Sequence, residues 1–164
     1  MSPSLACVFV DALPVQVEWQ KRGVRVPLII THPVETDAVF AVTPDVADAG
    51  VEPGMAIHAA RRAAPQALVV APDEMAYHAA HAVIQAALGQ FSPAIETVGL
   101  GEFFVDVRGL GPHFPNEVAL GQALVTAARA ASGFTVHAGL AAGKFTAQQA
   151  ARTAYPNEAI AVPA

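Results

Sequence analysis

The sequence predicts an α/β fold of the α+β kind, in which helices cover a mixed β-sheet and a small helical lobe interrupts the strands. Short apolar runs of strand length alternate with amphipathic or alanine-rich stretches that begin at capping residues. In the middle of the chain, residues 94–109 predict two short strands joined by a tight turn at Gly99-Leu100-Gly101-Glu102. Such a hairpin excludes an all-parallel, doubly wound sheet.

The other elements are predicted from the same patterns. We expect strands at residues 5–10, 26–31, 37–43, 67–71, 134–140 and 159–162, and helices at 15–22, 44–50, 55–64, 73–88, 116–131 and 144–153. Asp11 is expected to cap the first helix and Pro14 to lie in its first turn, since acidic caps and an early proline both favour helix starts. Thr43 followed by Pro44 predicts the start of the short helix in the lobe.

Composition limits the possible functions. The 164 residues suit one domain, and the net charge of −5 argues against a strong grip on nucleic acid, which needs Lys and Arg to neutralise phosphates. A single cysteine, Cys7, excludes an intrachain disulfide and fits a reducing cytoplasm; it lies in an apolar run, so we expect a buried, inert thiol. No stretch approaches the roughly 18 apolar residues of a membrane span.

Three carboxylates are candidates for a metal site. Asp11 ends the first strand, while Glu102 and Asp106 lie on the hairpin, and adjacent central strands would bring them to one edge of the sheet. Two-metal catalysis needs two or three converging carboxylates around ions about 4 Å apart. Phe9, on the first strand, and Gly101, in the turn, supply no ligand. Residue chemistry alone therefore predicts no metal pair, with Asp11 as a helix cap and Glu102 as an exposed turn acid.

The remaining polar motifs predict structure rather than chemistry. His78 and His81 share one helix face, but a metal would need a third ligand, so we expect a solvated face. Residues 139–144, GLAAGK, lack the spacing of a phosphate loop and predict a strand-to-helix turn with Lys144 exposed. No nucleophile and base pair supports a small-molecule enzyme.

Four motifs, taken in order, resemble those of the Y-family translesion DNA polymerases, the UmuC-like family. They are FVDALPVQVE at residues 9–18, PDVADAGVEPGM at 44–55, FSPAIE followed by GLGEFFVD at 91–106, and GLAAGKFTAQQA at 139–150. The resemblance implies a palm at about residues 1–32 and 66–164 and a fingers-like lobe at 33–65. The thumb and little finger of that family are absent from these residues.

The same resemblance implies that several functional positions are substituted. Two of the family's metal-binding aspartates fall on Phe9 and Gly101, while Asp11 and Glu102 are retained. The residues that hold the incoming triphosphate fall on Pro44 and Ala47, and the aromatic residue that screens out ribonucleotides falls on Pro14, with Lys144 retained. The second lysine of the last motif falls on Gln148. We therefore expect no catalytic, nucleotide-binding or metal-ligating set, no Mg²⁺ of the kind used by active relatives, and a protein that is not an enzyme.

This pattern is similar to the ImuB-like branch of the family. The resemblance implies a pseudoenzyme of DNA repair in the cytoplasm, acting in the damage-induced (SOS) response as an adaptor for an active polymerase. A small accessory protein and a sliding clamp would be partners through regions beyond these residues, with only weak DNA contact here and no membrane contact. The alternative is a degenerate GGDEF or nucleotide-cyclase-like signalling domain, which Gly99-Leu100-Gly101-Glu102-Phe103 resembles but the 50–55 motif does not.

Overall fold

The computed structural model describes residues 3–163, which form two compact units. The first unit holds residues 3–11 and 79–163, and the second holds Ala12–His78. Six α-helices and two mixed sheets occur in the described residues, so the predicted α/β class is confirmed. The division into palm and fingers ranges stays a prediction.

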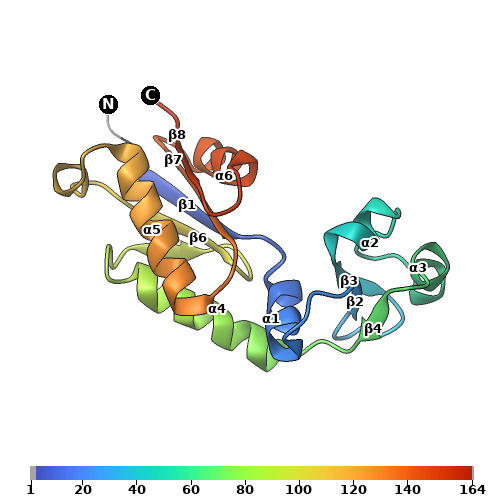
Figure 1. Ribbon diagram of the computed structural model, residues 1–164. Helices are drawn as coiled ribbons and strands as arrows, with labels where there is room; N and C mark the ends of the chain where they lie inside the picture. Colours follow the sequence, from blue (N-terminus) through green and yellow to red (C-terminus); the bar gives the residue numbers. More distant parts are fainter. Residues whose placement is uncertain (1–2, 164) are drawn as a thin grey trace. The chain divides into compact units, whose positions relative to one another are not determined.

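The first unit is built on a five-stranded sheet with the strand order β5-β6-β1-β7-β8 (Figure 1). The strands are β1 (Leu5–Val10), β5 (Ile95–Thr97), β6 (Glu102–Asp106), β7 (Val136–Ala141) and β8 (Ala159–Ala161). Every neighbouring pair is antiparallel except β7 and β8, which are parallel. The helices are α4 (Glu74–Leu88), which begins in the second unit, α5 (Glu117–Ser132) and α6 (Lys144–Thr153), with a short 3₁₀ turn, η1 (Gly111–His113).

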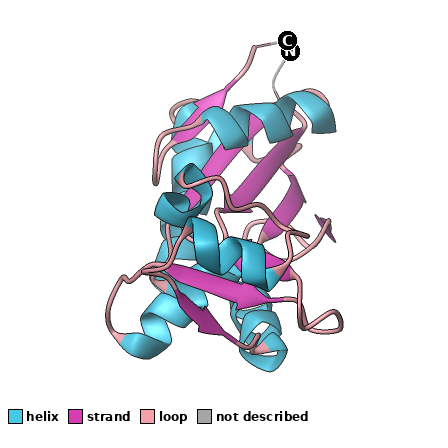
Figure 2. Ribbon diagram, turned by 90° about the vertical axis from the view of Figure 1, so that its right-hand side faces the viewer, coloured by secondary structure: helices cyan, strands magenta, loops and turns pink. Residues whose placement is uncertain are grey.

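The register gives the sheet two different faces. Side chains alternate along a strand, so Ala6, Val8 and Val10 of β1 face one way, while Cys7 and Phe9 face the other. The first face meets α5, where a Cβ on Gly121 would lie 2.5 Å from the Leu140 side chain. The second face meets α6, whose Ala147 and Ala151 pack with Cys7 and Phe104. Figure 2 shows these strands, in magenta, with helices in cyan on both sides.

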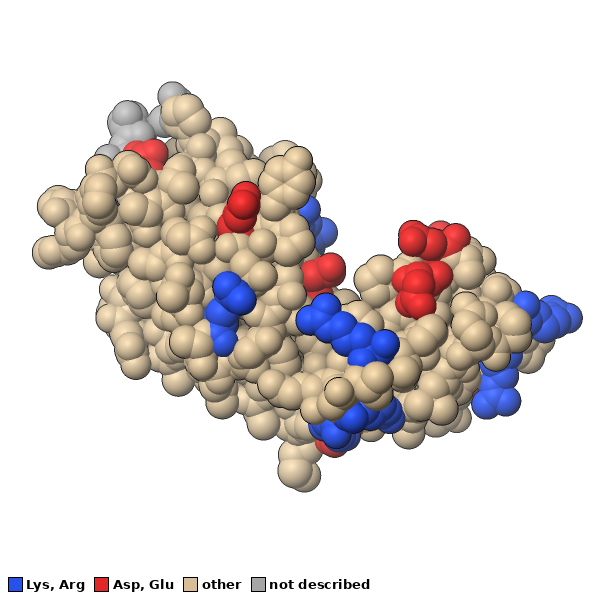
Figure 3. All heavy atoms as spheres, viewed as in Figure 1, with Lys and Arg blue, Asp and Glu red and all other residues tan. Residues whose placement is uncertain are grey.

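The second unit has a three-stranded sheet with the order β3-β2-β4. Its elements are α1 (Leu13–Arg22), β2 (Leu28–Thr31), β3 (Val39–Val42), α2 (Pro44–Asp48), α3 (Ile57–Ala63) and β4 (Leu68–Val70). A small core of Ile29, Val39, Val46, Val51 and Ala60 joins the sheet to the two short helices. In Figure 3 acidic side chains gather over α2, which carries the exposed Asp45 and Asp48.

One predicted helix cap is wrong. Ala12, rather than Asp11, is the residue at the start of α1, and its backbone lies in the left-handed region at φ 44° with no side-chain cap bond. Asp11 is exposed and lies one residue before this position. Thr43 does precede α2 as predicted, but its hydroxyl accepts a hydrogen bond from Leu28 N–H at 3.1 Å instead of capping the helix.

In residues 3–163 no helix is both long and apolar enough to cross a membrane. The predicted cytoplasmic location stays a prediction.

Candidate functional site

We use the name palm edge, after the predicted palm, for the end of β1 and β6 where Phe9 lies directly opposite Glu102 in the antiparallel register. Glu102 is only 8% exposed, so the expectation of an exposed turn acid is wrong. Residues directly opposite on an antiparallel pair face the same side, so Phe9 and Glu102 both point to the α6 face of the sheet. Asp11 lies beyond the end of β1 and is exposed.

The Glu102 carboxylate is held by donors from α6 and β1. Gln148 Nε2 donates to Glu102 Oε1 at 2.6 Å, and an Arg152 guanidinium nitrogen lies 3.3 Å from Oε2. The Cys7 thiol is 3.9 Å from Oε1. Both carboxylate oxygens are therefore engaged by the chain's own side chains.

An aromatic ring lies beneath the Arg152 side chain of α6. The Arg152 guanidinium lies over the Phe9 ring, 5.4 Å from its centroid, and the centroid of the His137 ring is 6.2 Å from that of Phe9. Cations are attracted to the negative face of such rings. His137 is held in place because its Nδ1 is 3.1 Å from the carbonyl oxygen of Ala154.

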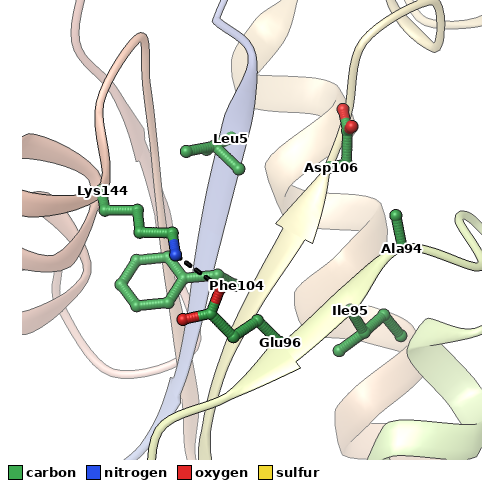
Figure 4. Close-up of a pocket in the computed structure, with 7 residues that line it drawn as sticks. All are labelled: Leu5, Ala94, Ile95, Glu96, Phe104, Asp106 and Lys144. Carbon is green, nitrogen blue, oxygen red and sulfur yellow. Dashed lines mark hydrogen bonds and ion pairs between the residues drawn. The ribbon is translucent and has the colours of Figure 1, made fainter.

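A second cation of the same helix lies further along the sheet. Lys144 Nζ pairs with Glu96 on β5 at 2.5 Å and lies 5.5 Å from the centroid of the Phe104 ring (Figure 4). Leu5, Asp106 and these side chains line an open hollow of about 270 Å³. The expectation of an exposed turn lysine is correct in part, since Lys144 is exposed but is held by Glu96.

Burial keeps the Cys7 thiol protonated. Burial, with the negative charge of Glu102 as the next cause, raises the pKa of the Cys7 thiol to about 12. Cys7 therefore stays protonated and donates weakly to the carboxylate. The predicted burial of Cys7 is confirmed, and its inertness stays a prediction.

The hairpin turn is held by a histidine that the sequence predicted for a solvated helix face. Gly101 has φ +81°, a conformation that favours glycine, and its N–H donates to His81 Nδ1 at 3.0 Å. The His81 ring stacks on Phe103 at 4.4 Å. His78 is exposed, as predicted.

The other predicted nucleotide positions lie in the second unit. Pro14 is buried in α1, whereas Pro44 and Ala47 are exposed on α2. None of the three side chains carries a hydrogen-bond donor or a charge, so within that unit these positions cannot hold a phosphate through their side chains.

The residues at the palm edge do not fit a pair of Mg²⁺ ions. Glu102 is a single carboxylate with an arginine and an amide already on it, and its cross-strand partner is an aromatic ring. Among residues 3–163 no group of three or more His, Cys, Asp or Glu side chains is placed to hold a metal ion. Mg²⁺ binds through oxygen ligands in near-octahedral geometry, which this donor set does not supply.

Sequence reasoning singled out Glu102 but missed its partner Arg152. Lys144, Gln148 and Arg152 recur at a spacing of four, which places them along one stripe of a helix. That spacing was the signal, but only the register of α6 on the sheet sets which carboxylates the stripe meets.

Comparison with known proteins gives the family. A family model described as impB/mucB/samB matches residues 8–152. The chain belongs to this family. Its fold is that of the Y-family DNA polymerase palm and fingers, because the solved ternary complex of Dbh superimposes with a TM-score of 0.85, at 25% identity, over 97% of this chain and 47% of that one. DinB from Sulfolobus solfataricus matches with the same TM-score at 26% identity over 97% of this chain and 48% of that one.

Curated relatives of this impB/mucB/samB chain carry one name. DNA polymerase IV of Neisseria meningitidis is 26% identical over 84% of this chain and 39% of its own length. DNA polymerase IV of Streptomyces coelicolor is 34% identical over 70% of this chain and 24% of its own length. The chain thus spans less than half the length of these relatives.

The prediction that the chain is not an enzyme is wrong. It rests on Phe9 and Gly101, whereas the relatives matched over most of the chain are named as a polymerase, and the matching structures include the insertion ternary complex of Dbh DNA polymerase. Two substituted positions change the ligands at one edge of the sheet and leave the rest of the polymerase fold in place. The branch within the impB/mucB/samB family stays a prediction.

Proposed function

We propose that this chain acts in DNA-damage bypass as the palm and fingers part of a Y-family polymerase-type protein. The observation that carries the proposal is the superposition on polymerase ternary complexes over nearly the whole chain, at a TM-score of 0.85 for Dbh. At 25% to 34% identity, the relatives and solved structures named above support the same role.

Within bypass we propose the ImuB-like role of an adaptor for an active polymerase. Support comes from the palm edge, where Gln148 and Arg152 both contact the buried carboxylate of Glu102. Further support comes from Pro44 and Ala47, which are exposed on α2 and have no side chain that can bind a phosphate. The accessory protein and the sliding clamp would be bound through regions outside these residues, in the cytoplasm.

A reconstituted bypass assay tests this role. The full-length protein, a replicative-type polymerase and both together are incubated with a lesion-containing primer-template, Mg²⁺ and deoxynucleotides. We expect the two proteins together to extend more primer past the lesion than the sum of the separate reactions. The reaction with this protein alone measures its own synthesis, the activity for which its relatives are named. A mixture that extends no more than the separate reactions contradicts the adaptor role.

The signalling alternative has no support in the comparisons. The impB/mucB/samB match covers both the hairpin and the 50–55 motif, which a GGDEF-type domain does not explain. Absence of cyclic-dinucleotide binding in a calorimetric titration is the expected result.

A further inference from the structure

The Glu102 carboxylate needs a positive partner. Its side chain is 11% exposed, and a carboxylate removed this far from water is destabilised unless a cation or several donors compensate it. In the part of the chain that the structure describes, Arg152 is the cation within ion-pair distance of Glu102. The Arg152 side chain is 49% exposed, so it reaches the carboxylate from the solvent side.

The packing of α6 against the sheet positions Arg152. Helix α6 lies on β7 so closely that a Cβ on Gly139 would be 2.2 Å from the Ala147 carbonyl oxygen and 2.3 Å from Ala151 N. Gln148, one turn before Arg152, donates to the same carboxylate, and the Phe9 ring lies under the guanidinium. The close packing of α6, the Phe9 ring and the Glu102 carboxylate therefore fix where the charge of Arg152 lies.

The arrangement repeats two helical turns earlier. Lys144 lies over Phe104 and pairs with Glu96, as Arg152 lies over Phe9 and pairs with Glu102. In both cases a cation of α6 meets one aromatic ring and one glutamate of the sheet. The repeat indicates that α6 supplies the positive charge to this face of the sheet.

We propose that the Arg152 guanidinium is the resident cation of Glu102, and that a divalent metal ion and Arg152 compete for this carboxylate. On this proposal, the palm edge does not provide the ligands of a two-metal site because Arg152 already occupies Glu102. The inference goes beyond the proposed function, because it concerns what neutralises the edge and does not depend on any bypass partner.

A second carboxylate makes the competition measurable. Phe9→Asp places an acid directly opposite Glu102, since the two positions are partners in the β1–β6 register. Mn²⁺ binding is then measured by electron paramagnetic resonance for Phe9→Asp and for Phe9→Asp with Arg152→Ala. We expect about tenfold tighter Mn²⁺ binding in the second protein, because a nearby cation repels the metal ion.

Matched variants identify the cause. Arg152→Lys in the Phe9→Asp background retains the charge, so Mn²⁺ binding should stay weak, and Arg129→Ala removes an exposed arginine of α5 and should change nothing. Glu102→Gln should abolish the binding gained with Arg152→Ala. Equal affinities with and without Arg152, or tight binding that survives Glu102→Gln, would overturn the proposal.

A second measurement does not need Phe9→Asp to fold. In the otherwise native protein, Mn²⁺ should broaden the nuclear magnetic resonance signals of residues beside Glu102 in Arg152→Ala and not in the unmodified chain. Equal broadening in the two proteins, or none in either, contradicts competition at this carboxylate.

Discussion

At the scale of single residues, Gly139 determines how closely α6 approaches the sheet. The atoms that a Cβ would meet there, Ala147 O and Ala151 N, belong to the helix backbone and cannot turn aside as a flexible side chain could. We expect Gly139→Ala to destabilise the protein by about 1–3 kcal/mol, the usual cost of overpacking. Urea denaturation measures the change. Gly111→Ala, where nothing lies within 4 Å of the new methyl group, serves as the control and should cost far less.

The buried acid of the second unit is a further residue-scale feature. Glu18 is 1% exposed; it pairs with Arg22 and accepts a hydrogen bond from the Tyr77 hydroxyl at 2.8 Å. Tyr77→Phe removes that donor, and we expect a loss of about 1–2 kcal/mol of stability in urea denaturation because a buried acceptor loses one partner.

The same contact predicts a pH dependence. Burial and the neighbouring Glu18 raise the pKa of Tyr77, so the folded protein keeps this proton to higher pH than the unfolded chain. The stabilisation is fully present below the ordinary tyrosine pKa of about 10 and is lost as the pH rises through the folded value. The tyrosinate absorbance should show one late component that Tyr77→Phe removes. A native protein whose alkaline titration is unchanged by Tyr77→Phe would contradict the assignment.

At the scale of elements, the hairpin turn depends on α4. His81 Nδ1 accepts from Gly101 N–H only when that nitrogen carries no proton. His81→Leu removes the acceptor, so we expect faster hydrogen exchange at Gly101 and a loss of about 1 kcal/mol. His81→Asn places an amide oxygen near the former Nδ1 and should restore much of the protection. Equal exchange in all three proteins would show that the bond does not hold the turn.

Local sequence patterns predicted most helices and strands, because the residues that begin and end each one lie next to it in the sequence. The β1 and α6 bounds match the expected 5–10 and 144–153, and Asn116 caps α5 by accepting from Ala119 N–H. Asp73 likewise accepts from Ala76 N–H at the start of α4. The left-handed Ala12 and the η1 turn were missed, since neither has a distinctive residue pattern.

The site was harder to predict than the fold. Sequence motifs found Phe9, Gly101 and Glu102, because the first lies on the predicted first strand and the other two at the glycine turn of the hairpin. They did not find Arg152 or His81, whose roles depend on how a helix from elsewhere in the chain packs against the hairpin. Such contacts between distant segments leave no local signal in one sequence.

At the scale of the whole molecule, ion pairs occupy most of the Lys and Arg side chains, so few of these positive charges are available to bind phosphates. Five of the nine Lys and Arg side chains form ion pairs in the described residues: Lys21, Arg22, Arg108, Lys144 and Arg152. The pKa of Asp106 falls to about 2 because Arg108 hydrogen-bonds to it, so that pair stays charged at neutral pH. Figure 3 shows separated charges on the α5 side of the first unit rather than a basic patch.

This distribution of charge predicts weak DNA binding by these 164 residues, and it predicts which Lys and Arg side chains contribute to that binding. Binding to duplex DNA depends on cations that neutralise phosphates, and Arg152 already neutralises Glu102. Arg61 and Arg62 are exposed in the last turn of α3 and are not among the paired cations. In fluorescence anisotropy with a labelled primer-template, we expect a dissociation constant weaker than about 10⁻⁵ M near physiological salt. Arg61→Ala with Arg62→Ala should weaken binding further and reduce its salt dependence, whereas Arg152→Ala should not, so a larger loss with Arg152→Ala would contradict the role given to that side chain.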